Sequence, residues 1–203
     1  IRDVERSRGL GDVYKRQAYY ETIGGGMGAR PNKDGLSGVH THMTNTMNTP
    51  IEALEAYLPL RFLTYRLRTD SGGPGKYRGG CGIERAWVLT SDKAGLSIMA
   101  ERNKIPPWGL QGGKPGGLGV YKLRRASGET EVLPSKCTVE MKRGDELIIM
   151  TPGGGGFGEP LSRPVDKVVT DVANGLVSTA SADADYGVVV DPETYEVKAL
   201  KRP

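Results

Sequence analysis

The hydrophobic residues of this chain fall mostly into short runs that alternate with polar residues, the pattern typical of β-strands. Residues 61–68 show it, with Phe62, Tyr65 and Leu67 set among polar residues and a Gly-Gly turn following. Each further predicted strand is bounded by Gly, Pro or Ser-Gly turns; these strands are 83–90, 95–100, 119–124, 129–133 and 145–150. The pattern therefore predicts a body that is mostly β.

The segment before these strands is different. Residues 20–48 mix Gly, Asn, Thr and His with few apolar residues, which favours long loops with short extended pieces. Residues 51–57 contain good helix formers, and we expect Thr49 to cap this helix with Pro50 at its first position. A short helix therefore precedes the first predicted strand of the body.

The C-terminal segment changes composition, because glycine becomes rare and helical spacing appears. Residues 165–177 place apolar side chains on one helix face, and Gly175 marks the expected end. A second short helix over 181–186 precedes a predicted β-hairpin, whose strands 186–190 and 195–197 flank an Asp-Pro turn. We expect this appendage to pack on the β body.

The whole pattern predicts an α+β fold that is predominantly β. Its main part is a glycine-rich, long-looped β body over residues 18–160, and a small helical and hairpin appendage covers 161–203. Residues 1–17 carry five Arg or Lys residues but no strand or helix period. We interpret them as a non-native or disordered leader that carries no chemistry.

Length, charge and cysteine content narrow the class of protein. A chain of 203 residues fits one domain, or one domain with an appendage. The net charge of +4 comes without a basic stripe interleaved with aromatic residues, so nucleic acid is not implied. No apolar run approaches the ~20 residues that span a bilayer. Cys81 and Cys137 lack metal-site or disulfide-framework spacing, which favours reduced thiols in a cytoplasmic protein.

Thirty glycines gather in clusters along the chain, and one cluster follows a predicted strand directly. In this cluster, formed by Gly153, Gly154, Gly155 and Gly156, successive N–H groups could hold a carboxylate or phosphoryl oxygen. The Lys-Ser/Thr ending of a P-loop is missing. The equally weighted alternative is close backbone packing at a subunit or domain interface.

Both histidines of the chain stand in one short motif, as His40 and His42. In an extended segment the two imidazoles point to one side and could serve a metal or a substrate. Glu21 and Asn45 are near in sequence and are further candidates for binding a substrate. The alternative, which we weigh more heavily, is that the histidines are hydrogen-bonded loop residues.

A charged pair, Glu101-Arg102, precedes a proline turn that contains Trp108. The favoured interpretation is a structural salt bridge beneath the turn, with Trp108 as a packing plug.

The order of these motifs resembles the hydantoinase B/5-oxoprolinase family, and more distantly a subunit of acetone-type carboxylases. The similarity covers nearly all of residues 19–160, and the combination is specific although each motif is weak alone. The motifs are Tyr-Tyr-Glu-Thr at 19–22, Ser-Gly-Val-His-Thr-His-Met-Thr-Asn-Thr at 37–46, Pro-Leu-Arg at 59–61, Asp-Ser-Gly-Gly at 70–73, Tyr-Arg-Gly-Gly at 77–80, Glu-Arg at 101–102, Pro-Trp-Gly at 107–109 and the glycine stretch at 151–158.

The resemblance implies an enzyme that opens a cyclic amide at the expense of ATP. A hydantoinase A-type ATP-binding partner would phosphorylate the amide oxygen, and this subunit would assist hydrolysis of the activated ring in a hetero-oligomer. His40 or His42 would then transfer protons, and the glycine cluster would hold carboxylate or phosphate. ATP and a divalent metal are expected in the complete enzyme, although we assign neither to this chain.

Two departures limit the resemblance. The matching region is the C-terminal part of a longer subunit, and the family's metal-ligand motifs precede it, so no metal ligand can be assigned here. Met47 also stands where the family often has Arg, which removes an anion contact. Two alternatives stay open: a non-catalytic β-rich interaction module, and part of an acetone-carboxylase-like enzyme. The substrate and the oligomeric state are left open too.

Overall fold

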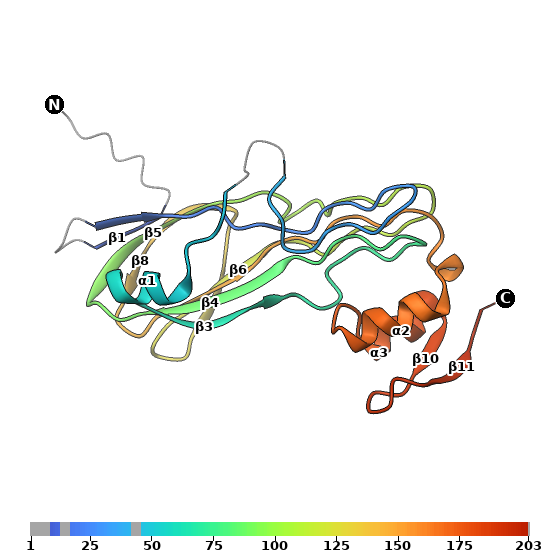
Figure 1. The fold of residues 1–203 in the computed structure, drawn as a ribbon. Coiled ribbons are helices and arrows are strands. Elements are labelled where there is room, and N and C mark those ends of the chain that lie inside the picture. The colour runs from blue at the N-terminus through green and yellow to red at the C-terminus, as the bar shows by residue number, and fades with distance from the viewer. Residues whose placement is uncertain (1–8, 13–16, 42–45, 203) are drawn as a thin grey trace.

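The computed structural model of the chain describes residues 9–12, 17–41 and 46–202. Two antiparallel sheets form the body (Figure 1). The first has the order β3-β4-β9-β6-β7, formed by Leu60–Leu67, Ile83–Leu89, Glu146–Met150, Val120–Arg124 and Thr130–Leu133. The second has the order β2-β1-β5-β8, formed by Gln17–Tyr20, Gly9–Asp12, Lys93–Met99 and Lys136–Lys142.

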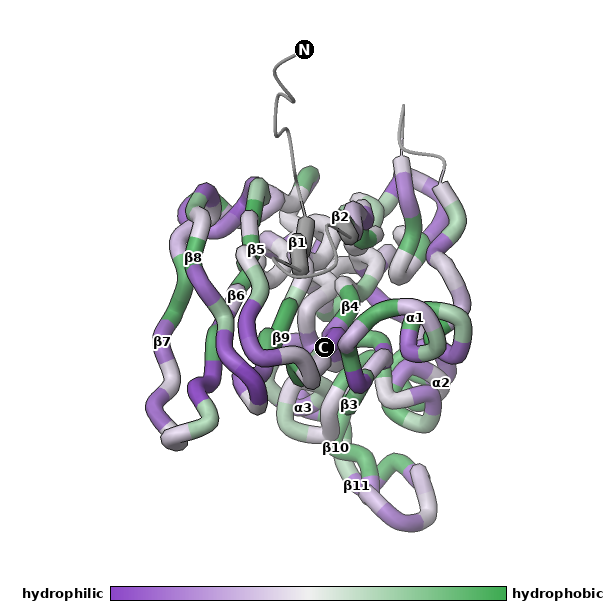
Figure 2. The backbone as a smooth tube through the Cα atoms, turned by 90° about the vertical axis from the view of Figure 1, so that its left-hand side faces the viewer, coloured by the Kyte–Doolittle hydropathy of each residue, from purple (hydrophilic) through white to green (hydrophobic). Residues whose placement is uncertain are grey.

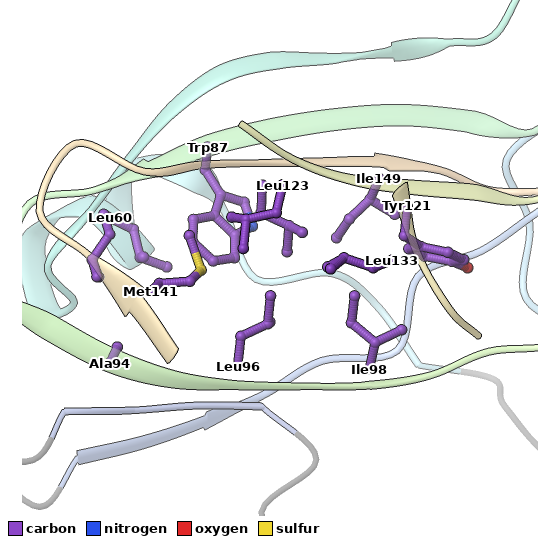
Figure 3. Close-up of a cluster of buried hydrophobic side chains, with 12 residues drawn as sticks. Leu60, Trp87, Ala94, Leu96, Ile98, Tyr121, Leu123, Leu133, Met141 and Ile149 are labelled. Atoms are coloured by element: carbon purple, nitrogen blue, oxygen red, sulfur yellow. The ribbon is translucent and has the colours of Figure 1, made fainter. Parts of the chain in front are cut away.

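The main hydrophobic core lies between these sheets (Figure 3). Trp87, Leu123 and Leu147 come from the first sheet, and Leu96 and Met141 come from the second. All five are at least 96% buried. β9 is almost continuously hydrophobic (Figure 2), as expected for a strand at the centre of a five-stranded sheet. The body is thus held by burial of apolar side chains from both sheets.

The predominantly β, α+β fold class is confirmed, and the six predicted strands correspond to β3, β4, β5, β6, β7 and β9. We did not predict β8, although Cys137, Val139 and Met141 alternate with polar residues along it. β1 and β2 were also not predicted.

The predicted boundary after residue 17 does not match the edge of the sheet. β1 lies inside the segment that we interpreted as a leader, and it pairs with both β2 and β5. Leu10, for example, is the backbone partner of Tyr19 on one side and Leu96 on the other. A four-residue strand containing two glycines is too short to show a period, which explains why the pattern was missed.

Beyond one end of the sheets, glycine-rich extended segments run side by side (Figure 1). The central one, residues 151–158, accepts backbone hydrogen bonds from 24–29 and both donates to and accepts from 71–83 and 107–119. A strand in a sheet has two hydrogen-bonding neighbours, whereas this segment has three. Such three-sided packing requires segments with few side chains, and we name the four segments the glycine bundle.

The predicted salt bridge beneath the proline turn is wrong. Glu101 pairs with Lys136 at 3.2 Å and not with Arg102, whose guanidinium lies 4.8 Å from the centre of the Trp108 ring. Trp108 is 64% exposed and is therefore not a packing plug.

The helices are close to the predicted ones, but α1 and α3 differ at their first residues and α2 ends earlier than the predicted residues 165–177. α1, Ile51–Tyr57, begins after Pro50 as its N-cap, so Thr49 does not cap it and no side chain bonds to its first turn. α2, Val165–Ala173, ends before Gly175, whose φ is 68°. α3, Thr179–Tyr186, begins earlier than predicted because the Ser178 side chain accepts a hydrogen bond from its first turn.

The C-terminal appendage has its own core and is hydrogen-bonded to Asp70, the residue before the 71–83 segment of the glycine bundle. β10, Val188–Val190, and β11, Val197–Leu200, form the predicted hairpin. Val168, Val172, Ala182, Tyr186 and Val188 are buried together. The Asp70 N–H donates to the Leu176 carbonyl over 3.1 Å, and the Ser178 N–H donates to the Asp70 carboxylate over 2.8 Å. No described helix is both long and apolar enough to cross a membrane.

Candidate functional site

A buried ion pair joins the start of the body to β4, an interior strand of the first sheet. Arg85 of β4 donates from Nη1 to the Glu21 carboxylate over 2.5 Å, and its side chain is 1% exposed. The Tyr19 hydroxyl donates to the same Glu21 oxygen, also over 2.5 Å. Burial and the neighbouring Glu21 raise the pKa of Tyr19 well above its usual range. The phenol therefore keeps its proton and remains a donor to Glu21.

Two aromatic rings flank the Arg85 guanidinium. Its central carbon lies 4.6 Å from the centre of the Phe62 ring and 4.9 Å from that of Tyr65. A bulge in β3 makes this possible, because the register shifts between Phe62 and Thr64. Without the extra residue, positions 62 and 65 would point to opposite faces of the sheet. The bulge thus places both rings around one buried cation, where cation–π attraction stabilises its charge.

Asn48 connects this pair to the histidine motif. The His40 Nε2 lies 3.5 Å from the Asn48 side-chain oxygen, at the limit of hydrogen-bonding distance. The Asn48 amide nitrogen donates to the Tyr65 hydroxyl. A continuous set of side chains therefore runs from half-buried His40 to the buried pair. We call this set the histidine–arginine cluster; it contains Tyr19, Glu21, His40, Asn48, Phe62, Tyr65 and Arg85.

The cluster brings together two of the predicted site residues, His40 and Glu21, which are 19 positions apart in the sequence. Within the described residues, Glu21 Oε1 and two nitrogens of Arg85 are buried and have no hydrogen-bond partner. Sequence reasoning missed Arg85, Tyr65 and Asn48. A signal for Arg85 exists, because it is the only arginine in β4, a predicted strand whose other residues are apolar except for Glu84.

The other two candidates of the histidine motif, His42 and Asn45, lie outside the described residues. The prediction that His40 and His42 share one side of an extended segment is therefore not tested. Their assignment continues to rest on the sequence motif alone.

The glycine cluster has a packing role in the structure. The N–H groups of Gly153, Gly154 and Gly156 donate to backbone carbonyl oxygens over 2.9 to 3.1 Å. All four glycines are buried in the glycine bundle. These three donors are therefore not free to hold a phosphate in this conformation, and the geometry agrees with the alternative of close backbone packing.

No group of three His, Cys, Asp or Glu side chains in the described part of the chain could hold a metal ion. The His40 Nε2 is paired with the Asn48 side-chain amide, and Glu21 is already engaged by Arg85. These residues do not form a metal site among themselves.

Comparison with known proteins identifies one protein family for most of the chain. The model of the family described as hydantoinase B/oxoprolinase matches residues 4–160. The B component of a putative D-/L-hydantoinase from Pseudomonas sp. is 36% identical over 174 residues, which are 85% of this chain and 29% of that protein. The family match starts inside the segment interpreted as a leader, in agreement with the position of β1.

Two solved structures share the fold. The ATP-dependent caprolactamase from Pseudomonas jessenii matches with a TM-score of 0.76 and 30% identity, over 91% of this chain and 34% of that chain. The nucleotide-free structure of acetone carboxylase matches with a TM-score of 0.73 and 26% identity, over 86% and 28%. The chain thus spans about a third or less of the proteins it matches.

Proposed function

The chain belongs to the hydantoinase B/oxoprolinase family, and from this premise we propose that it forms part of a subunit of an ATP-dependent cyclic-amide hydrolase. We also propose a partner, a substrate class and a site. The partner is a hydantoinase A-type subunit that binds ATP, the substrate is a lactam or hydantoin, and the site includes the histidine–arginine cluster. The observation that carries the site is the set of contacts between His40 and the Glu21–Arg85 pair.

The chemistry requires activation of the amide before water attacks. The carbonyl carbon of a lactam is a poor electrophile, and transfer of a phosphoryl group from ATP to the carbonyl oxygen provides a leaving group. Water then adds to the activated carbon, the ring C–N bond breaks and the nitrogen gains a proton, which leaves an acyl phosphate. A second water attacks the acyl carbon, and phosphate leaves to give the free carboxylate. His40, with Nε2 held near the Asn48 amide, is proposed to move a proton in this sequence.

Glu21 receives a different role from the one expected of a substrate ligand. Its Oε2 already accepts hydrogen bonds from Tyr19 and Arg85. We propose that Glu21 is a positioning residue, which fixes Arg85 and, through Tyr65 and Asn48, the orientation of His40. His42 and Asn45 remain proposed site residues on the sequence motif.

The test uses the complete subunit that contains this chain, co-produced with its A-type partner. ADP release that depends on 5-oxoproline, hydantoin or caprolactam is measured at saturating ATP. We expect His40→Ala to lower kcat by roughly 10²–10⁴-fold, the usual range for loss of a proton-transfer group. Met47→Ala is the matched control, because Met47 is a neighbour of the same loop, is 94% exposed and should leave kcat unchanged.

Equal kcat values for His40→Ala and the wild-type protein would remove His40 from the site and leave the family assignment intact.

A second candidate function is favoured by the similarity to acetone carboxylase. ADP release that depends on acetone and bicarbonate, with none on the three amides, would support that carboxylase-like alternative. A complex that binds its partner but hydrolyses ATP with none of these substrates would support the interaction module.

A further inference from the structure

A hydrogen bond from α1 fixes the bulge in β3. The register of β3 on β4 shifts between Phe62 and Thr64, so Leu63 is the extra residue. The Phe62 N–H, just before this residue, donates to Glu55 Oε1 of α1 over 2.7 Å. A hydrogen bond to a carboxylate is stronger than one between two neutral groups. Glu55 therefore holds the strand at the point where its ladder with β4 is interrupted.

The sheet alone specifies this bulge only weakly. β3 lies at the edge of the first sheet, so ladder hydrogen bonds hold it from one side. Beyond Leu60, its side chains are half-buried or exposed. Burial therefore does little to fix the register, and a slip that removed the bulge would point Phe62 and Tyr65 to opposite faces. The contact with Glu55 is the one that favours the bulged register.

α1 can fix the strand because the helix is itself anchored. Leu54 is buried, and Leu58, the residue after the helix, packs against the main core. The Leu58 N–H donates to the Leu54 carbonyl over 2.8 Å. Leu58 and Pro59 form the whole connection between α1 and β3. A short connection and a buried helix face thus hold the Glu55 carboxylate in a defined place beside the strand.

The same helix also positions Asn48. The Pro50 carbonyl accepts a hydrogen bond from the Leu54 N–H over 3.1 Å, so the first turn of α1 fixes the backbone two residues after Asn48. Asn48 donates to the Tyr65 hydroxyl and lies beside His40. α1 therefore positions Asn48 through the chain and Tyr65 through the bulge. Both partners of the contact that leads to His40 depend on this helix.

We propose that Glu55 is a positioning residue for the histidine–arginine cluster, which acts by selecting the bulged register of β3. In the described part of the chain, its carboxylate bonds to the Phe62 backbone and to no side chain of the cluster. The bulge in turn sets the position of Tyr65 and, through Asn48, that of His40. The inference rests on the proposed function, because Glu55 affects turnover only if His40 belongs to the site.

Amide-dependent ADP release by the complete subunit with its A-type partner tests this role. Glu55→Ala should lower kcat about 10–100-fold and change KM less than about 2-fold, because misplacement of a proton-transfer group weakens binding of the transition state and not of the substrate. Glu55→Gln keeps an oxygen that accepts from the Phe62 N–H and should restore most of kcat. Glu52→Ala is the matched control, since Glu52 is an exposed glutamate in the first turn of the same helix. Circular dichroism checks that each variant is folded.

A double-mutant cycle separates positioning from a loss of stability. Tyr65→Phe removes the hydroxyl to which Asn48 donates. If Glu55 acts through this hydroxyl, Glu55→Ala should lower kcat less than about 2-fold further in the Tyr65→Phe background. The same fold-loss in both backgrounds would mean that Glu55 acts independently of Tyr65, and would overturn the proposal.

NMR of isotope-labelled histidine in the same subunit gives a readout that needs no substrate. The His40 signal is identified by its absence from His40→Ala. It should shift in Glu55→Ala and stay in place in Glu55→Gln and Glu52→Ala, because only the first change releases the bulge and, with it, Asn48. An unchanged His40 signal in Glu55→Ala overturns the positioning role, whatever the turnover. Absence of turnover in the wild-type complex with every amide would count against the proposed function instead, and the His40 signal would still decide the role of Glu55.

Discussion

At the scale of single residues, the glycines contribute to the fold mainly because they have no side chain, and less through any group that they bind. A Cβ atom at Gly154 would overlap the Met27 carbonyl, and one at Gly79 would overlap the Gly154 carbonyl. Backbone segments approach each other so closely in the glycine bundle that most side chains are excluded. The clusters could be recognised from the sequence as structured loops, but their three-sided hydrogen bonding depends on contacts between distant segments.

Gly154→Ala therefore tests the glycine bundle directly. The added methyl group collides with backbone on a segment that cannot rotate away, so we expect a loss of about 3 kcal/mol or more in the free energy of unfolding. Gly95→Ala is the matched control, because a Cβ atom there has no neighbour within 4 Å. Urea unfolding followed by circular dichroism measures both. Similar stabilities of the two variants would contradict the packing role.

The candidate site shows what single-residue reasoning can and cannot reach. The histidine motif and the nearby Glu21 could be selected from the sequence as candidates, and the structure connects His40 with Glu21 through Asn48, Tyr65 and Arg85. Arg85 and Tyr65 could not be predicted as neighbours, because their proximity depends on a β-bulge and on strand pairing. Local sequence does not specify either feature, since the partner strand decides which residues face each other.

At the scale of elements, the strands with clear alternation were predictable and the exceptions have particular reasons. β8 carried a regular period that the prediction overlooked, whereas β1 is too short to show one. The N-termini of α1 and α3 were displaced because proline and serine residues next to them, and not the expected ones, occupy the capping positions. Element types thus followed from periodicity, and boundaries followed from capping geometry.

A buried charge network joins the appendage to Arg78 of the glycine bundle and to Asp34, which lies between the 24–29 segment and the histidine motif. Arg163 is 1% exposed and forms two hydrogen bonds of 2.8 Å with the Asp34 carboxylate, one from each Nη. It also donates to Asp171 of α2 over 2.7 Å. Arg78 lies 3.3 Å from the same Asp171 oxygen. Because two arginines share these carboxylates, removal of one acid leaves buried positive charge uncompensated.

The network predicts that the free energy of unfolding decreases when the pH is lowered. Burial opposes ionisation of Asp34, but hydrogen bonds and charge from Arg163 hold its pKa below its usual range. A carboxyl group with a lower pKa in the folded chain stabilises the fold fully above its unfolded pKa, near 4, and this stability is lost as pH falls through the folded pKa. Asp34→Asn should therefore cost about 2 kcal/mol at pH 7 and reduce the loss of stability on acidification.

Urea unfolding at pH values from 7 down to 3 measures this effect. Asp92→Asn is the control, because the Asp92–Arg143 pair is mostly exposed and should contribute less than about 0.5 kcal/mol. Some acid sensitivity should persist in Asp34→Asn, since hydrogen bonds from Lys142, Ala126 and Arg125 also lower the pKa of Asp145 against the effect of its burial. An unchanged pH profile in Asp34→Asn would contradict the role of the network.

At the scale of the whole molecule, two separate hydrophobic cores are joined by polar contacts. One core lies between the sheets of the body, and the other lies among α2, α3 and β10. The described connections between them are hydrogen bonds and ion pairs, such as Lys114 with Asp185 at 2.8 Å. The predicted boundary near residue 160 rests on the periodicity and the glycine content, which both change there.

This division predicts that the appendage can open while the body stays folded. Val168 of the second core and Leu123 of the first are both fully buried. We expect Val168→Ala to cost roughly 1–3 kcal/mol and to speed amide hydrogen exchange over residues 165–190, with little change over 120–150. Leu123→Ala, costing about 2–5 kcal/mol, should speed exchange in the body sheets. Hydrogen exchange followed by mass spectrometry distinguishes the two patterns.

Faster exchange across the whole chain in Val168→Ala would instead mean that the polar contacts couple the two cores into one cooperative unit. Opening the appendage would then require opening the body.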